Sequence, residues 1–267
     1  MTDIQKVVLE LLIEIDRICR KNKIEYALGY GSALGIVNFQ GFIPWDEDAD
    51  IIMTKDNWDK FVSACKIDLN QNKYVLDCFE NNSKYDIFIP AKLRYKDSRV
   101  VEKFDSEYFT SHTENRGIFV DIQIIIPVEN ELNYLNLMRK FCKKSILNIP
   151  TNFLTKEKYK NKLKLFELNY IENNKNYNQK YRQTFLSGGQ YFVEKKRNSH
   201  FYSTLFPVKE CEFESHKFYS VNNIKQYCID LYGEKCFNYL EYSDKLKKSK
   251  FKKYKIYDKE RGKNINH

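Results

Sequence analysis

Apolar residues recur at helical spacing over the first part of the chain. They are Ile4, Val7, Val8, Leu11, Leu12, Ile15, Ile18 and Cys19. This spacing predicts an amphipathic helix over residues 3–22, capped by Thr2 or Asp3. Acidic residues share its polar face, so we expect the helix to pack on a sheet rather than lie on a membrane. The apolar run at residues 24–28 predicts a first strand.

The clearest strand pattern covers residues 116–127, where side chains alternate between two faces. One face carries Ile118, Val120, Ile122, Ile124 and Ile126, and the other carries Phe119, Asp121, Gln123 and Ile125. A carboxylate in such an apolar strand is unfavourable unless it pairs with a metal or a cation. Asp121 is therefore a candidate site residue, and a hydrogen-bonded core aspartate is the alternative.

The other patterns mix strands and helices, which predicts an α+β fold. We expect a helix at 56–65, short strands at 74–76 and 87–89, and a helix at 222–231 that ends at Gly233. Residues 131–180 have a helical, basic pattern that Pro150 divides, with a surface loop at 171–180. We divide the chain into a core at 1–130, a helical or mixed region at 131–244 that completes the same domain, and a basic tail at 245–267.

Composition narrows the class of protein. Apolar residues make up 42% of the chain, which supports a folded core, and the net charge of +9 favours anionic partners. The seven cysteines form no Cys-x-x-Cys pair, and the histidines complete no zinc pattern. We expect reduced thiols in a cytoplasmic protein. The N-terminus lacks the apolar core of a signal peptide, and no apolar run is long enough to span a membrane.

The densest chemistry lies at residues 29–53, where we expect a glycine-rich loop before Asp46, Asp48 and Asp50. If this stretch is extended, the three carboxylates share one face, where a divalent cation would offset their repulsion. A solvated acidic turn is the simplest alternative, but the apolar Ile51-Ile52-Met53 argues against it. A calcium loop would need Gly at position 51 and Glu at position 57, and a dinucleotide fingerprint would need a different glycine spacing and a following helix.

Two segments resemble the LicD family of phosphocholine transferases, relatives of fukutin and fukutin-related protein. They are Gly31-Ser-Ala-Leu-Gly35 and Gly41-Phe-Ile-Pro-Trp-Asp-Glu-Asp-Ala-Asp50. The strand around Asp121, the segment Ala91–Ser98 and the Tyr232-Gly233 pair are similar to later blocks of the family. The resemblance implies a nucleotidyltransferase-like mixed β-sheet core flanked by helices, with a helical C-terminal extension. One departure is Asn38-Phe39, where the family usually has Arg-His.

The resemblance also implies a site. Asp48, Asp50 and Asp121 would be catalytic and bind Mg²⁺ or Mn²⁺, with Asp121 acting as a metal ligand or as the base. The residues expected to bind substrate are Gly31, Ser32, Trp45, Asp46, Lys92 and Arg94. Asp46 would not bind the metal itself but would orient one of the metal ligands or an Arg or Lys side chain. Solvated strand edges are the alternative for Lys92 and Arg94.

The implied reaction transfers phosphocholine from CDP-choline to a hydroxyl of a cell-surface glycan and releases CMP. Ribitol phosphate or glycerol phosphate transfer from another CDP-alcohol, and small-molecule nucleotidyl transfer, stay open. A catalytically silent nucleic-acid-binding module is the alternative from another class, but the three intact carboxylates argue against it, so nucleic acid is not an expected partner. We expect the acceptor to be free or lipid-linked, and the protein to be cytoplasmic. The aromatic, Lys-rich tail would be a frayed terminus or a contact with the inner face of the membrane.

Overall fold

The computed structural model describes most of the N-terminal half and selected later segments. The described residues are 1–78, 80–81, 91–102, 116–129, 134, 165–166, 168–174, 176–177, 179–183, 199–238, 251–258 and 263–266. The expected strand at 87–89 and most of the helical pattern at 131–164 lie outside these ranges.

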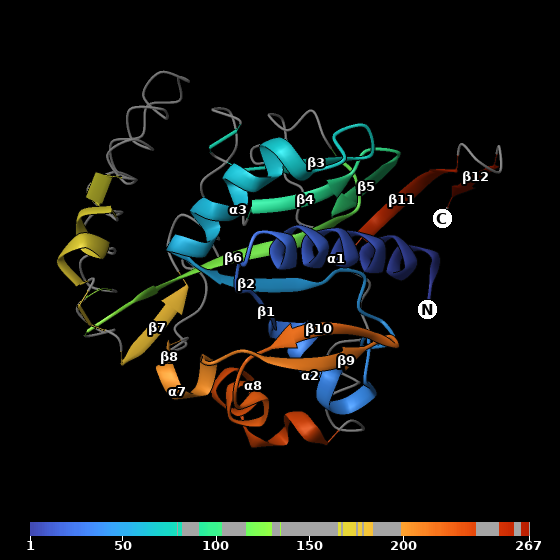
Figure 1. The fold of residues 1–267 in the computed structure, drawn as a ribbon. Helices are drawn as coiled ribbons and strands as arrows, with labels where there is room; N and C mark the ends of the chain where they lie inside the picture. The colour runs from blue at the N-terminus through green and yellow to red at the C-terminus, as the bar shows by residue number, and fades with distance from the viewer. Residues whose placement is uncertain are drawn as a thin grey trace, which may run out of the picture.

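A mixed, largely open β-sheet forms the centre of the described structure (Figure 1). Its strands run in the order β3-β4-β6-β2-β1-β10-β9, and β7 pairs with β6 and with β8. Their bounds are β1 Ala27–Gly29, β2 Asp50–Thr54, β3 Tyr74–Asp77, β4 Ala91–Tyr95, β6 Phe119–Pro127, β7 Lys180–Gln183, β8 Ser199–Phe201, β9 Lys209–Phe213 and β10 His216–Ser220. β2 and β6 are parallel, and β1 pairs antiparallel with β2 and parallel with β10.

Helices cover both faces of this sheet. On one face α1 (Asp3–Lys21) and α3 (Lys55–Asp68) pack on β2 and β6, as Figure 1 shows. On the other face α2 (Tyr30–Phe39), α7 (Tyr202–Leu205) and α8 (Ile224–Tyr232) share a second apolar cluster with Ile52. A short 3-10 helix, η3 (Glu234–Phe237), follows α8.

Several elements confirm the sequence pattern. Thr2 caps α1 in a reciprocal capping box with Gln5, and Gly233 ends α8. The two faces expected for β6 are found in part: Ile118 and Ile122 belong to the large cluster under α1 and α3, whereas Ile125 belongs to the cluster under α2 and α8. Phe119, expected on the face of Ile125, belongs to the large cluster instead. A mixed α/β architecture is therefore confirmed.

Other expectations were wrong. The glycine-rich segment was expected to be a loop, but it begins α2. β2 begins only at Asp50, so Asp46 and Asp48 are not strand residues on a shared face. Residues 171–174 are helical, and Lys180 begins β7, where a surface loop was expected.

The basic tail is not simply a frayed terminus. Residues Phe251–Asp258 form β11, which pairs with β5 (Ser98–Glu102) and with β12 (Lys263–Asn266) in a separate three-stranded sheet. Ile256 is buried in the large apolar cluster, with 6% of its surface exposed. The tail therefore contributes to the folded core, and its contact with a membrane stays a prediction. Within the described residues, no helix is both long and apolar enough to cross a bilayer.

Replacing Ile256 by alanine tests this packing. We expect the free energy of unfolding to fall by about 2 kcal/mol, the lower end for a buried isoleucine, because the small sheet lies at the edge of the core. Urea denaturation measures the change. Ile67→Ala is the matched control, since Ile67 is 85% exposed. Equal midpoints for the two variants would contradict the packing of β11.

Candidate functional site

Asp50 and Asp121 lie side by side on neighbouring parallel strands. They are register partners in the β2–β6 ladder, and the Asp121 N–H donates to the Ala49 carbonyl at 2.8 Å. Register partners in a parallel pair project from the same face, here the face that carries Ile52 and packs against α2 and α8. The strand pairing therefore brings together carboxylates from distant parts of the sequence.

The first turn of α2 is next to this pair. Gly29 is the N-cap of α2, and the Ser32 hydroxyl accepts a hydrogen bond from the Asp50 N–H at 3.0 Å. The free N–H groups of a helix N-terminus favour a bound anion such as a phosphate. Because Ser32 contacts the β2 backbone, the N-terminal end of α2 is fixed beside Asp50.

Asp46 and Asp48 precede β2 in the chain. A Cβ added to Gly31 would lie only 2.8 Å from an Asp46 carboxylate oxygen, so the absence of a side chain at Gly31 permits this close approach. The Asp46 carbonyl accepts a hydrogen bond from the Gln5 side chain, which ties the segment to α1. Asp48 is buried, with 8% of its surface exposed. The structure thus places Asp46 beside the first turn of α2, as a residue that orients the site would be.

Both predicted cations of β4 pair with carboxylates. The buried Lys92 ammonium forms an ion pair with Asp121 and lies over the Phe119 ring. Arg94 donates to Asp77 and to the Gly117 carbonyl, each at 3.1 Å, and is also buried. Lys92 is therefore part of the carboxylate site, whereas the contacts of Arg94 join β4 to β3 and to the start of β6.

Trp45 packs at the other end of α2, against its last residue, Phe39. Its ring meets that of Phe39 edge-on at 6.4 Å, and it packs against the cluster under α2 and α8. Trp45 is partly exposed.

The carboxylates suit a hard divalent cation by their chemistry. Oxygen ligands are what Mg²⁺ and Mn²⁺ prefer, and Mg²⁺ usually uses one or two carboxylates together with waters and substrate phosphates. In the described part of the chain, no three His, Cys, Asp or Glu side chains are gathered closely enough to hold a metal. Asp50 and Asp121 therefore fit a cation shared with a phosphate ligand better than a closed protein cage.

Sequence reasoning missed one group beside the site. The imidazole of His200, on β8, contacts the Asp230 carboxylate at 3.1 Å and stacks on the Tyr227 ring with centroids 4.4 Å apart. The Tyr227 hydroxyl accepts the Tyr30 N–H at 3.3 Å. These residues come from β8 and α8, and no local motif in the sequence predicts their meeting.

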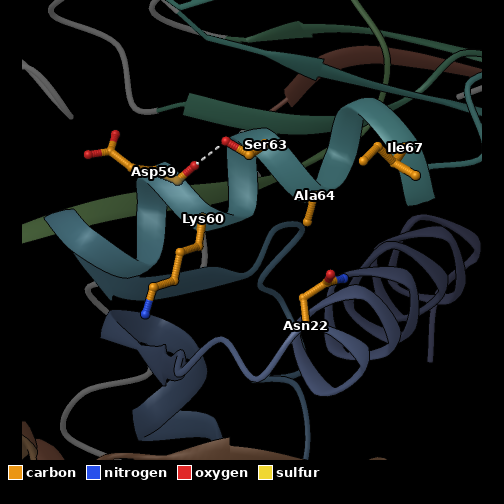
Figure 2. A pocket seen from close by; sticks show the side chains of 6 residues that line it. All are labelled: Asn22, Asp59, Lys60, Ser63, Ala64 and Ile67. Atoms are coloured by element: carbon orange, nitrogen blue, oxygen red, sulfur yellow. Dashed lines mark hydrogen bonds between the residues drawn. The ribbon is translucent and has the colours of Figure 1, made fainter.

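A surface groove lies away from the carboxylate pair, between the C-terminal end of α1 and α3, and Figure 2 shows its lining residues. They are Asn22, Asp59, Lys60, Ser63, Ala64 and Ile67. This is the face of the sheet opposite Asp50, and none of the predicted site residues lines the groove.

The cysteines of the described chain add no chemistry to the site. All six that are described are free thiols. Burial raises the pKa of Cys65 and Cys228 to about 12, so both stay protonated at neutral pH. Reduced thiols are thus confirmed for these residues.

A carboxylate pair beside the N-terminus of a helix is an arrangement suited to handling phosphorylated ligands. Residues 23–118 match the sequence profile described as LicD/FKTN/FKRP, nucleotidyltransferase domain. This segment includes Asp46, Asp48 and Asp50 and ends three residues before Asp121.

The similarity extends well beyond that domain. The chain is 25% identical over 256 residues to the lipopolysaccharide cholinephosphotransferase LicD of Haemophilus influenzae, across 86% of this chain and 89% of the relative. The domain match and this relative both support a relationship of this chain to the LicD family.

Proposed function

We propose that this protein is a metal-dependent phosphocholine transferase that uses CDP-choline and a glycan hydroxyl. The observation that carries the proposal is the pairing of Asp50 with Asp121 beside the first turn of α2. The family and the printed activity of the Haemophilus relative support choline phosphate as the transferred group and lipopolysaccharide as the kind of acceptor.

The site residues divide into those that bind the cation and those that bind the diphosphate. Asp50 and Asp121 would hold Mg²⁺ or Mn²⁺. Asp48 is buried in the segment before β2, and its role as a further ligand stays a prediction. The amides of Gly31 and Ser32 would bind oxygens of the donor diphosphate, as helix N-termini bind phosphates. Asp46 borders the same turn, so it would contact the donor or orient its ligands. Trp45 meets Phe39 at the far end of α2, so a role for Trp45 in binding the donor stays a prediction. The bound cation would neutralise charge on the diphosphate and on the departing CMP.

The transfer step follows from these positions. The acceptor oxygen forms a bond to the phosphorus that carries choline, and the bond from that phosphorus to the bridging oxygen of CMP breaks. The hydroxyl proton passes to a carboxylate, for which Asp121 is our candidate. Lys92, already paired with Asp121, would balance negative charge during this step. The products are CMP and the phosphocholine-bearing glycan.

Calorimetry with a panel of donors tests the proposal. We expect CDP-choline to bind with Mg²⁺ or Mn²⁺ present, and chelation of the metal to abolish most of the binding. CDP-ribitol, CDP-glycerol and CTP serve as matched nucleotides. The assay is then repeated with purified lipopolysaccharide as acceptor, and released CMP is measured.

Each outcome has a distinct meaning. Metal-dependent binding and CMP release with CDP-choline alone would support the proposal. The same behaviour with CDP-ribitol or CDP-glycerol instead would replace choline but keep the transfer chemistry. Pyrophosphate release from CTP would favour a small-molecule nucleotidyltransferase. Absence of metal-dependent nucleotide binding would overturn the proposal.

A further inference from the structure

The β1–α2 connection holds a bulky residue in an unfavourable backbone conformation. Tyr30, the first residue of α2, has φ of +45°, a left-handed conformation that side chains with a Cβ rarely adopt. Such strain persists only where surrounding contacts impose it, and it concentrates at functional sites. The contacts that hold Tyr30 are therefore of interest.

Tyr227 supplies such contacts. Its hydroxyl accepts the Tyr30 N–H at 3.3 Å, and the two rings meet edge-on with centroids 6.4 Å apart. The hydroxyl also lies 3.2 Å from where a Cβ on Gly29 would be, so a larger residue at position 29 would crowd it. Tyr227 thus holds Tyr30 and packs closely on Gly29 at the start of α2.

Tyr227 is itself held firmly from α8 and β8. It is 1% exposed, and the His200 ring stacks on it at 35° between the planes. His200 is in turn fixed by Asp230, one turn of α8 away from Tyr227. Burial raises the pKa of the Tyr227 hydroxyl well above its ordinary value, so the group stays neutral over the physiological range.

We propose that Tyr227 is a positioning residue of the transferase site. Its hydroxyl holds the first turn of α2 in the conformation that presents the Gly31 and Ser32 amides to the donor diphosphate, and His200 and Asp230 hold Tyr227. This inference rests on the proposed function, in which that turn binds the donor. It assigns a role to residues 200–230, which lie outside the segment that matches the family domain.

Tyr227→Phe is the direct test, because it keeps the ring and its stacking and removes only the hydroxyl. Tyr26→Phe is the matched control: Tyr26 is also 1% exposed, and its hydroxyl donates to Asp16 at 2.7 Å, away from α2. We expect Tyr227→Phe to raise the Kd for CDP-choline and for inorganic pyrophosphate about 10-fold, as is usual when a supporting contact is lost. Tyr26→Phe should leave both unchanged.

Amide hydrogen exchange in the ligand-free protein provides a second measurement. We expect faster exchange over residues 29–33 in Tyr227→Phe, and unchanged exchange there in Tyr26→Phe. Asp230→Asn should shift binding and exchange in the same direction as Tyr227→Phe, by a smaller factor. Wild-type exchange and affinity in Tyr227→Phe would overturn the inference, as would equal losses in both tyrosine variants, which would indicate a general effect of stability.

The ligands separate this inference from the proposed function. If the wild type binds pyrophosphate but not CDP-choline, the proposed donor is wrong and Tyr227 is judged on pyrophosphate. If the wild type binds neither ligand, both the donor site and the role of Tyr227 are overturned.

Discussion

Asp50→Asn is expected to lower the turnover number by about 10³-fold or more while leaving the protein folded. The substitution removes one of two adjacent carboxylates that would share the metal, and metal and proton-transfer groups contribute on this scale. It keeps the backbone N–H that Ser32 accepts, so the contact between β2 and α2 survives. Turnover is measured as CMP release, and metal affinity by calorimetry.

The stability of this variant provides a further check. Asp50 and Asp121 are like charges on neighbouring strands, and Lys92 offsets only part of their repulsion, so we expect Asp50→Asn to unfold at the same temperature as the wild type or higher. Asp59→Asn is the charge-matched control. Asp59 lies on α3 (Figure 2), its side chain is 56% exposed and paired with Lys55, and α3 packs on the face of the sheet opposite Asp50. Normal turnover in Asp50→Asn, or an equal loss in Asp59→Asn, would contradict the assignment of the site.

Arg94→Met is expected to lower the free energy of unfolding by about 3–5 kcal/mol, the usual effect of removing one partner from a buried ion pair. The substitution leaves the Asp77 carboxylate, 2% exposed, without its guanidinium, and the Gly117 carbonyl loses a donor. Since ordinary domains are stable by about 5–15 kcal/mol, this loss would be severe. Guanidinium denaturation measures it.

Two variants keep this prediction open to contradiction. Arg17→Met removes an arginine that is 47% exposed and paired with Glu14 on α1, and should cost less than about 1 kcal/mol. Arg94→Met/Asp77→Leu removes both buried charges and should recover much of the stability. If Arg94→Met is as stable as Arg17→Met but binds CDP-choline weakly, Arg94 serves the donor rather than the sheet.

The sequence predicted best those structural features that depend on residues close together in the chain. Residues 116–127 predicted the strand β6, since apolar side chains occupy both of its faces. In so apolar a strand the single carboxylate, Asp121, could be recognised as a candidate site residue. The capping box at Thr2 and the helix end at Gly233 depend on residues a few positions apart, and both were predictable.

The pattern was least informative where partners come from distant segments. Glycines and a serine have low helical propensity, so α2 could not be predicted from residues 29–35; its contacts with β1, β2 and α8 stabilise it instead. Alternating aspartates suggested a strand from Asp46 onward, but β2 starts only at Asp50. Nothing near Arg94 in the sequence reveals that Asp77 lies within reach across β3 and β4.

The place of β10 in the sheet has a consequence for how the protein is made. β1 has β2 on one side and β10 on the other, with Leu28 opposite Ser220. The ribosome synthesises β1 early and β10 near the end, so one edge of β1 stays unpaired during most of synthesis. The β1–β10 pairing joins residues that are far apart in the sequence, and such contacts form slowly. We infer that folding of the central sheet finishes only after most of the chain has emerged, and that a fragment ending at residue 118 would expose an aggregation-prone strand edge.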